Sequence, residues 1–222
     1  MRKTDGKRSS RLSQLLLFDQ DYLKQGYESL AGLDEAGRGP WAGPVVASAV
    51  IVRDFSFQNA VDDSKKMTPR SRESAYDEIL AKCVVGVGIV EPEEIDRINI
   101  LQATFRAMTE ALEGLGVAPA CVLVDGNHAT KAPYRQIPVV DGDAKSFSIA
   151  CASVVAKVTR DRIMEYYDEL YPRYGFARHK GYGTASHTEA LKKYGPCRIH
   201  RMSFEPIRNH GNTSHNRLRF TV

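Results

Sequence analysis

Apolar residues along this chain gather in short segments of two kinds, which predict strands alternating with helices. Five short, mostly apolar runs have the length of strands, and most of them are rich in valine, isoleucine or leucine. They cover residues 31–34, Val45–Val52, 84–90, 120–124 and Gln136–Val139. Other segments predict helices, from apolar residues three or four positions apart or from a capping residue at the start. These segments cover residues 15–25, Pro69–Lys82, 91–94, 100–115, 146–171 and 185–194.

Two of the predicted helices have a recognisable start. Thr68 stands at an N-cap position before Pro69, a residue that suits the first helical position, and Thr184 precedes the last helix in the same way. The early strands are joined by short or mixed connections, and the later ones are separated by helices. This order predicts an α/β domain with a mixed five-stranded sheet flanked by helices.

Both ends of the chain are predicted to lie outside the folded domain. Residues 1–12 are basic and polar, a composition that does not bury enough apolar surface to fold, so we expect a disordered tail. Residues 209–222 are polar and predict a second, irregular tail. Residues 13–208 remain as one domain with a helical C-terminal extension.

The composition narrows the class of protein. The formal charge of +4 suits a polyanionic partner but is also common in proteins that bind none. No apolar run approaches the roughly 18 residues that cross a bilayer, and the four cysteines form no C-x-x-C pair. We therefore expect a cytoplasmic protein with reduced thiols and no contact with a membrane. Cys197 and His200 have a ligand-like spacing, but a second close pair is missing, so a satisfied or solvated pair is the favoured interpretation.

One stretch combines acidic residues with a turn suited to phosphate. Asp34 and Glu35 follow a short strand and precede the turn Gly37-Arg38-Gly39. Glycine lets backbone N–H groups approach a ligand, and arginine offers a planar donor fork. This pattern fits a Mg²⁺ ion shared between carboxylates and a phosphodiester; a solvated turn is the alternative. Because neighbouring strand residues point to opposite faces, a shared site requires the strand to end or bulge at Asp34.

Two more carboxylates stand at the ends of predicted elements. Asp125 ends the fourth strand, and Asp143 precedes the longest helix, with Asp141 as an alternative to it. If the first and fourth strands are neighbours, these carboxylates meet Asp34 and Glu35 at one edge of the sheet. Four carboxylates repel one another unless cations neutralise them, so the pattern predicts two metal ions. Oxygen ligands favour Mg²⁺ or Mn²⁺ over zinc.

Several segments, in this order, resemble ribonuclease HII, the type 2 ribonuclease H. The resemblance spans about residues 28–208, and its combination of motifs is specific although each motif alone is weak. It is carried by residues 32–46, 63–66, 124–126, 142–161 and 180–187, and by Gly195-Pro196, His200-Arg201 and Ser203-Phe204, which look like the bacterial branch.

The resemblance implies an RNase H-like fold and an endonuclease that cuts the RNA strand of RNA–DNA hybrids. It also implies incision 5′ to ribonucleotides embedded in duplex DNA, as in ribonucleotide excision repair, leaving 3′-hydroxyl and 5′-phosphate ends. The catalytic, metal-binding carboxylates of the family match Asp34, Glu35, Asp125 and Asp143. The substrate would be such hybrids and ribonucleotide-containing duplexes, the cofactor Mg²⁺ or Mn²⁺, and the protein a monomer.

The substrate-binding residues are also carried over from the family. Gly37, Arg38 and Gly39 match the turn that recognises the ribose 2′-hydroxyl, the group that distinguishes RNA from DNA. Tyr182 matches the tyrosine that packs on the next deoxyribose, although alone it reads as a surface aromatic. Phosphate contacts are expected from Ser64, Lys65, Ser153, Lys157 and Arg160; a solvated helix face is the alternative for the last three.

Three other interpretations remain open. A nuclease of the same fold, such as a type 1 ribonuclease H or a resolvase, would use the same carboxylates on another nucleic acid. A non-catalytic module would bind hybrids through the basic helix and the glycine turn. His187 and His200 would either brace loops or contact the substrate.

Overall fold

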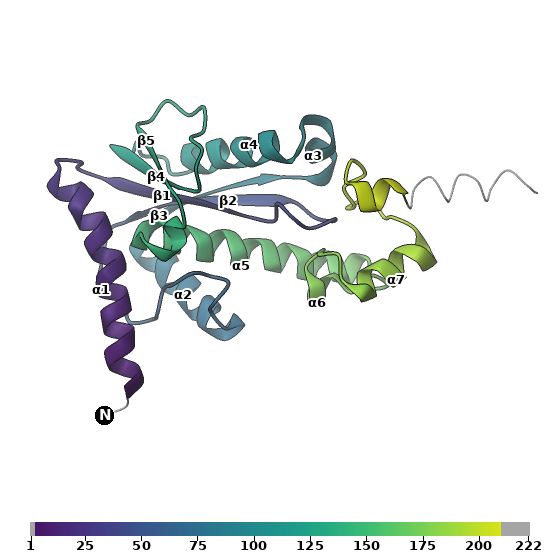
Figure 1. Cartoon of the computed structure of the whole chain (residues 1–222), viewed down its shortest axis with the longest axis horizontal. Helices are drawn as coiled ribbons and strands as arrows, with labels where there is room; N and C mark the ends of the chain where they lie inside the picture. The colour runs from purple at the N-terminus through teal and green to yellow at the C-terminus, as the bar shows by residue number, and fades with distance from the viewer. Residues whose placement is uncertain (1–2, 210–222) are drawn as a thin grey trace, which may run out of the picture. The chain divides into compact units, whose positions relative to one another are not determined.

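The structure, a computed structural model, describes residues 3–209, with side chains from Arg11 onward. Its centre is a five-stranded sheet of order β3-β2-β1-β4-β5 (Figure 1). The strands are β1 (Leu30–Ala36), β2 (Val45–Val52), β3 (Cys83–Val90), β4 (Cys121–Asp125) and β5 (Gln136–Val139). The helices are α1 (Lys3–Lys24), α2 (Pro69–Lys82), α3 (Pro92–Ile98), α4 (Ile100–Glu113), α5 (Phe147–Leu170), α6 (Phe176–His179) and α7 (Ala185–Tyr194), with a 3-10 helix at Gly142–Ala144. The predicted α/β class and mixed sheet are confirmed.

The sheet brings β1 and β4 together, as predicted. They pair in parallel with Leu33 opposite Val124, so their carboxyl ends lie at the same edge. β1 pairs antiparallel with β2 as far as Ala36, and this pairing includes Asp34 opposite Ser48. The predicted end or bulge of the strand at Asp34 is therefore wrong, because β2 continues to pair with β1 as far as Ala36. The pairing of β1 with β4 ends at Leu33, and the charge of Glu35 still acts on Asp34, so the two carboxylates interact without a bulge.

The described chain divides into two compact units, which we describe separately. Unit 1 consists of residues 3–36, 46–89 and 105–158, and unit 2 of residues 37–45, 90–104 and 159–209. In unit 1 the sheet has α4 on one face and α2 and α5 on the other (Figure 1). Glycines allow this close packing: a Cβ at Gly32 would lie 2.0 Å from the backbone of Ser148 on α5. A Cβ at Gly88 would lie 2.0 Å from the carbonyl oxygen of Ala107 on α4.

The predicted helix caps are confirmed. The hydroxyl of Thr68 accepts a hydrogen bond from Ser71 N at 3.2 Å, and that of Thr184 accepts one from His187 N at 3.2 Å. Helix α3 is longer than the single turn expected, and α6 was not predicted. The described part of the C-terminal region is helical over residues 205–209, and the rest of the predicted polar tail lies outside the described residues.

Helix α1 corrects the prediction for the N-terminus. It begins at Lys3, so residues 3–12 are helical where disorder was expected. Tertiary contacts explain the difference: Leu15 is fully buried against unit 1, and the Arg11 guanidinium donates to Asp62 at 2.9 Å and to Ala144 O at 2.9 Å. Over the part of the chain that the structure describes, helices of sufficient length and apolarity to cross a membrane are absent.

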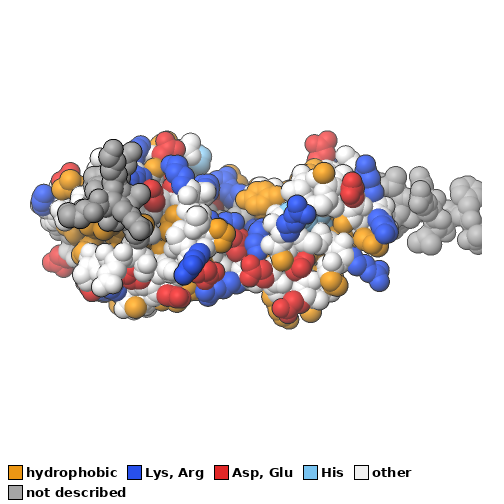
Figure 2. Space-filling model, turned by 90° about the horizontal axis from the view of Figure 1, so that it is seen from below, with side chains coloured by type: hydrophobic (Ala, Val, Ile, Leu, Met, Phe, Trp, Pro, Cys, Tyr) orange, Lys and Arg blue, Asp and Glu red, His pale blue; other side chains and the backbone are white. Residues whose placement is uncertain are grey.

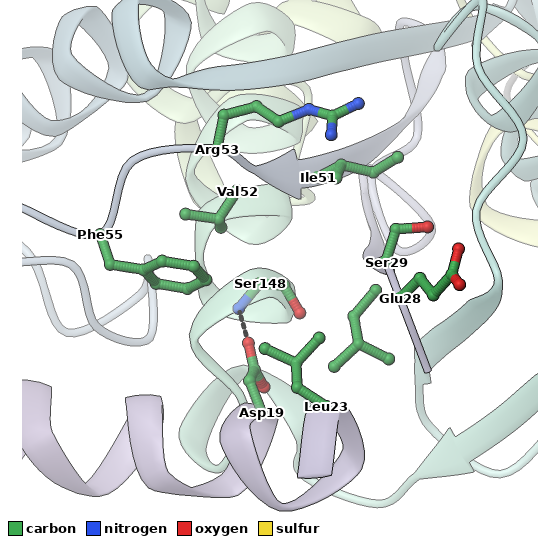
Figure 3. A pocket seen from close by; sticks show the side chains of 10 residues that line it. Asp19, Leu23, Glu28, Ser29, Ile51, Val52, Arg53, Phe55 and Ser148 are labelled. Atoms are coloured by element: carbon green, nitrogen blue, oxygen red, sulfur yellow. Dashed lines mark hydrogen bonds between the residues drawn. The ribbon is translucent and has the colours of Figure 1, made fainter. Parts of the chain in front are cut away.

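Asp19 joins α1 to the start of α5. Its buried carboxylate accepts hydrogen bonds from the Ser146 hydroxyl at 2.6 Å and from Ser148 N at 2.8 Å. Figure 3 shows the hydrogen bond between Asp19 and Ser148 N among the side chains, including Leu23 and Phe55, that line a cavity of about 130 Å³. Negative charge at a helix N-terminus is favourable, so Asp19 anchors the helix that follows the 3-10 segment.

Candidate active site

Four acidic residues lie at or near the edge of the sheet in unit 1. Asp34 and Glu35 belong to the last part of β1, Asp125 is the last residue of β4, and Asp143 lies in the 3-10 helix after β5. Asp34 and Asp143 are buried, whereas Glu35 and Asp125 are half-buried. A cavity of about 310 Å³ brings Asp125 and Asp143 together with Lys65, Gly126, Asn127, Val140 and Asp141.

Burial and neighbouring negative charges raise the pKa values of two of these acidic residues. Burial raises the pKa of Asp34 well above its usual value, and the negative charges of Glu35 and Asp125 add to the effect. Burial also raises the pKa of Asp143, with further contributions from Asp125 and Asp63. Lys65 opposes this effect, since its Nζ lies 3.8 Å from Asp143 Oδ2. The charges of Glu35 and Asp125 therefore act on Asp34, and those of Asp125 and Asp63 act on Asp143; a cation would relieve this repulsion.

Short hydrogen bonds hold two of these carboxylates in place. Asp34 Oδ1 accepts from Glu35 N at 2.7 Å, and the Ser153 hydroxyl also bonds to this carboxylate. Asp125 Oδ1 accepts from Gly142 N at 2.7 Å. A Cβ at Gly142 would lie 3.0 Å from that same oxygen, so the close approach depends on glycine.

The donor set has the chemistry of a Mg²⁺ or Mn²⁺ site, since every candidate ligand is a carboxylate oxygen. Within the described residues, no three side chains of His, Cys, Asp or Glu are arranged around one point at which they could hold a metal ion. Asp34 and Asp125 each direct an oxygen at a backbone N–H. The residues therefore fit a divalent ion by ligand type.

The structure places the five predicted phosphate contacts in different environments. Ser64 and Ser153 are 3% and 4% exposed, and their hydroxyls bond to each other at 2.9 Å. Arg160 is 1% exposed, and its donors point at backbone carbonyl groups. The hydrogen-bonding groups of these three side chains are engaged inside the protein, and their contacts with phosphate stay a prediction. Lys65 has an exposed side chain at the acidic cavity, and Lys157 is half-buried.

The distribution of charge on the surface does not by itself mark a path for nucleic acid on the face that Figure 2 shows. There, lysine and arginine side chains are interspersed with aspartate and glutamate. Attraction to a polyanion must then come from particular side chains such as Lys65 rather than from a continuous basic tract on this face.

The predicted turn and Tyr182 lie side by side in unit 2. A Cβ at Gly39 would lie 3.7 Å from Cε1 of Tyr182, whose side chain is half-exposed. Trp41 N donates to Gly181 O at 2.9 Å, and the Trp41 ring leaves no space for a side chain at position 183. The turn and the tyrosine loop therefore form one local surface, with an aromatic ring beside exposed backbone.

The two histidines left open by the sequence are structural. His187 and His200 are 0% and 1% exposed, and their Nε2 atoms lie 3.0 Å apart. His200 Nδ1 accepts from Cys197 N at 2.9 Å, which satisfies the Cys197–His200 pair without a metal. These side chains brace loops inside unit 2 and do not reach a substrate. The spacing of His187 and His200 in the sequence does not indicate that their side chains are in contact.

This mixed sheet, with acidic residues at the ends of neighbouring parallel strands, defines the class of nucleases with an RNase H-like fold. The crystal structure of ribonuclease H2 from Pyrococcus horikoshii OT3 superposes with a TM-score of 0.70 at 29% identity, covering 87% of this chain and 100% of that one. Bst-RNase HIII in complex with Mn²⁺ shares the fold, with a TM-score of 0.66 at 15% identity over 85% of this chain and 70% of that one.

The sequence comparisons identify the family. The family model described as Ribonuclease HII matches residues 31–207. Ribonuclease HII of Syntrophobacter fumaroxidans is 53% identical over 195 residues, covering 87% of this chain and 84% of that protein. The chain belongs to the ribonuclease HII family and is a ribonuclease H endonuclease, which confirms the resemblance noted in the sequence.

Proposed function

We propose that this ribonuclease hydrolyses the RNA strand of RNA–DNA hybrids and nicks duplex DNA on the 5′ side of embedded ribonucleotides. The products carry 3′-hydroxyl and 5′-phosphate ends. The observation that supports this proposal most is the position of Asp34, Glu35, Asp125 and Asp143 at or near one edge of the sheet. There the charges of Glu35 and Asp125 act on Asp34, and the charge of Asp125 acts on Asp143. Membership of the ribonuclease HII family supports the same activity.

The four carboxylates are the proposed ligands of two divalent ions, Mg²⁺ or Mn²⁺. When bound, such ions lower the pKa of an attacking water and stabilise the leaving 3′-oxygen. The protein contributes fixed acceptors: Asp34 is held by Glu35 N, and Asp125 by Gly142 N. Lys65, exposed beside Asp143, supplies a positive charge for a substrate phosphate.

The turn Gly37-Arg38-Gly39 is proposed to recognise the 2′-hydroxyl, and Tyr182 to pack on the following deoxyribose. This assignment rests on the family resemblance and is supported by the position of Tyr182 beside Gly39. Lys157 is kept as a phosphate contact. We further expect a monomer that acts in the cytoplasm.

The decisive experiment is incision of a DNA duplex that contains one ribonucleotide. In Mg²⁺ or Mn²⁺ we expect a single nick 5′ to the ribonucleotide, with none after chelation by EDTA. An all-DNA duplex of the same sequence is the control. Absence of nicking in both metals would exclude the proposed activity, and equal cutting of the all-DNA duplex would show that cleavage does not depend on the ribonucleotide.

Long RNA–DNA hybrids complete the comparison. Cleavage of long hybrids without incision at a single ribonucleotide would favour the type 1 ribonuclease H interpretation. Binding of hybrids without cleavage in either metal would favour the non-catalytic module.

A further inference from the structure

Two fully enclosed arginines lie beneath the turn of residues 37–44 in unit 2. Arg201 is 0% exposed and Arg160 is 1% exposed, and they are among the largest fully buried side chains of the described chain. A buried charge is costly unless it is well hydrogen-bonded. The contacts of these guanidinium groups therefore identify what they do in the fold.

Arg201 binds the carbonyl oxygens of the turn. Its Nη2 donates to Gly37 O at 2.5 Å and to Pro44 O at 3.1 Å. Its Nη1 donates to Arg38 O at 3.0 Å, and its Nε donates to Gly43 O at 2.9 Å. One guanidinium thus holds both ends of the turn, and the planar fork of arginine suits such a set of acceptors.

Arg160 supports the same turn from a second direction. Its Nε donates to Pro44 O at 3.0 Å and its Nη2 to Ala42 O at 3.1 Å. Its Nη1 donates to Lys180 O at 3.0 Å, close to the tyrosine loop. A Cβ at Gly37 would lie 2.1 Å from Arg160 Nε, and Gly37 has a φ of +97°, so a glycine is required there.

The hydrogen bonds from Arg201 determine which way the peptide groups after Gly37 and Arg38 face. In a planar trans peptide the C=O and N–H bonds point in opposite directions. The carbonyl of Gly37 shares its peptide plane with the N–H of Arg38, and the carbonyl of Arg38 shares its plane with the N–H of Gly39. Because Arg201 holds both carbonyl oxygens, these two N–H groups point away from its guanidinium. Successive N–H groups that face one side form a concave donor site.

We propose that Arg201 is the positioning residue that determines the preference for ribose over deoxyribose, by orienting the N–H groups of Arg38 and Gly39 toward the 2′-hydroxyl. This inference rests on the proposed function, because it assumes that the turn reads the sugar. Arg201 thereby joins the residues that determine sugar selection, although it touches no substrate and lies far along the chain from the turn. Lysine at position 201 keeps the charge but loses the planar fork, so it cannot reproduce the four hydrogen bonds that Arg201 donates to the turn.

The test measures the binding of two duplexes by the full chain carrying Asp34→Asn, which keeps the substrate uncut. One duplex contains a single ribonucleotide, and the other is all DNA. Arg201→Lys should reduce the ratio of the two affinities at least about tenfold, roughly the value of one hydrogen bond. The affinity for the all-DNA duplex should change little.

The matched control is Arg198→Lys, whose side chain is 82% exposed and pairs with Glu93. It should leave the affinity ratio unchanged. An equal loss of affinity for both duplexes on Arg201→Lys would show that Arg201 has a merely structural role. Unchanged affinities for both duplexes would show that Arg201 has no role in binding. Absence of a ribose preference before any change at position 201 would overturn the proposed sugar reading, and this inference with it.

A second measurement does not depend on whether Arg201→Lys folds. In the Asp34→Asn protein, the backbone amide resonances of Arg38 and Gly39 should shift more with the ribonucleotide duplex than with the all-DNA duplex. Equal shifts with the two duplexes would contradict the inference.

Discussion

The Nε2 atoms of His187 and His200 lie 3.0 Å apart inside unit 2, and the neighbouring groups assign the proton between them. Cys197 N donates to His200 Nδ1, so His200 carries its proton on Nε2 and donates to His187. His187 then carries its proton on Nδ1 and donates to Tyr182 O at 3.0 Å. Two neutral histidines therefore connect the region around Cys197 to the loop of the proposed substrate tyrosine.

This pair predicts a loss of stability in acid. Burial lowers the pKa of His187 and of His200 to about 4, each from 6.5, and the neighbouring histidines, including His179, add to the effect. Between pH 6.5 and about pH 4 the unfolded chain binds more protons than the folded protein. The free energy of unfolding therefore rises with pH, and the protein loses stability as the pH falls through this range. The slope should reach about 1.4 kcal/mol per pH unit for each histidine.

Urea unfolding between about pH 7 and pH 5 measures this slope. His187→Gln should reduce it, whereas His128→Gln, outside the buried group, should not. The same slope in the wild-type protein and the His187 variant would rule out the pair as its source.

Asp34→Asn should abolish cleavage while binding of a hybrid is retained. The change removes the charge of a buried proposed ligand and keeps its size. We expect the cleavage rate to fall more than about 100-fold, beyond the loss typical for the outer partners of metal ligands. Asp21→Asn, at a side chain that is 70% exposed, is the matched control. An unchanged cleavage rate would remove Asp34 from the proposed site.

Tyr182→Ala should weaken incision at single ribonucleotides more than cleavage of long hybrids. The ring lies beside Gly39, where it is proposed to pack on the deoxyribose after the junction. We expect about a tenfold larger loss in kcat/KM for the single-ribonucleotide duplex, near 1.4 kcal/mol of packing. Tyr182→Phe keeps the ring and should retain most of the kcat/KM for the single-ribonucleotide duplex. Equal losses on both substrates would argue against a role at the junction.

Asp19→Ala should destabilise the fold without altering a residue of the proposed site. It removes the acceptor for the Ser146 hydroxyl and for Ser148 N at the start of α5. The expected cost is about 1–3 kcal/mol in the free energy of unfolding, since buried donors lose their partner. Asp21→Ala on the exposed side of α1 should cost far less. Similar costs for both variants would show that Asp19 does not anchor α5.

Local patterns in the sequence predicted much of the fold. Most of the five strands were found because buried runs rich in valine, isoleucine and leucine are contiguous, and two helix starts because a cap acts within three residues. The position of Asp125 at the end of β4 followed from the same pattern. The acidic residues were predicted as a group because carboxylates gathered at the ends of neighbouring strands repel one another unless cations neutralise them.

Other features depend on contacts between residues far apart in the chain. Arg160 was predicted to contact phosphate, yet in the structure it donates to Ala42 O, 118 positions away. Arg201 reaches Gly37 O across 164 positions, and Arg11 supports α1 through Asp62, 51 positions away. A local pattern does not reveal such partners, because only the packed chain brings them within hydrogen-bond distance. The composition and periodicity of the chain were therefore sufficient to predict its helices and strands and the acidic residues at the edge of the sheet. Only tertiary packing determined the hydrogen-bond partners of the buried arginines and histidines.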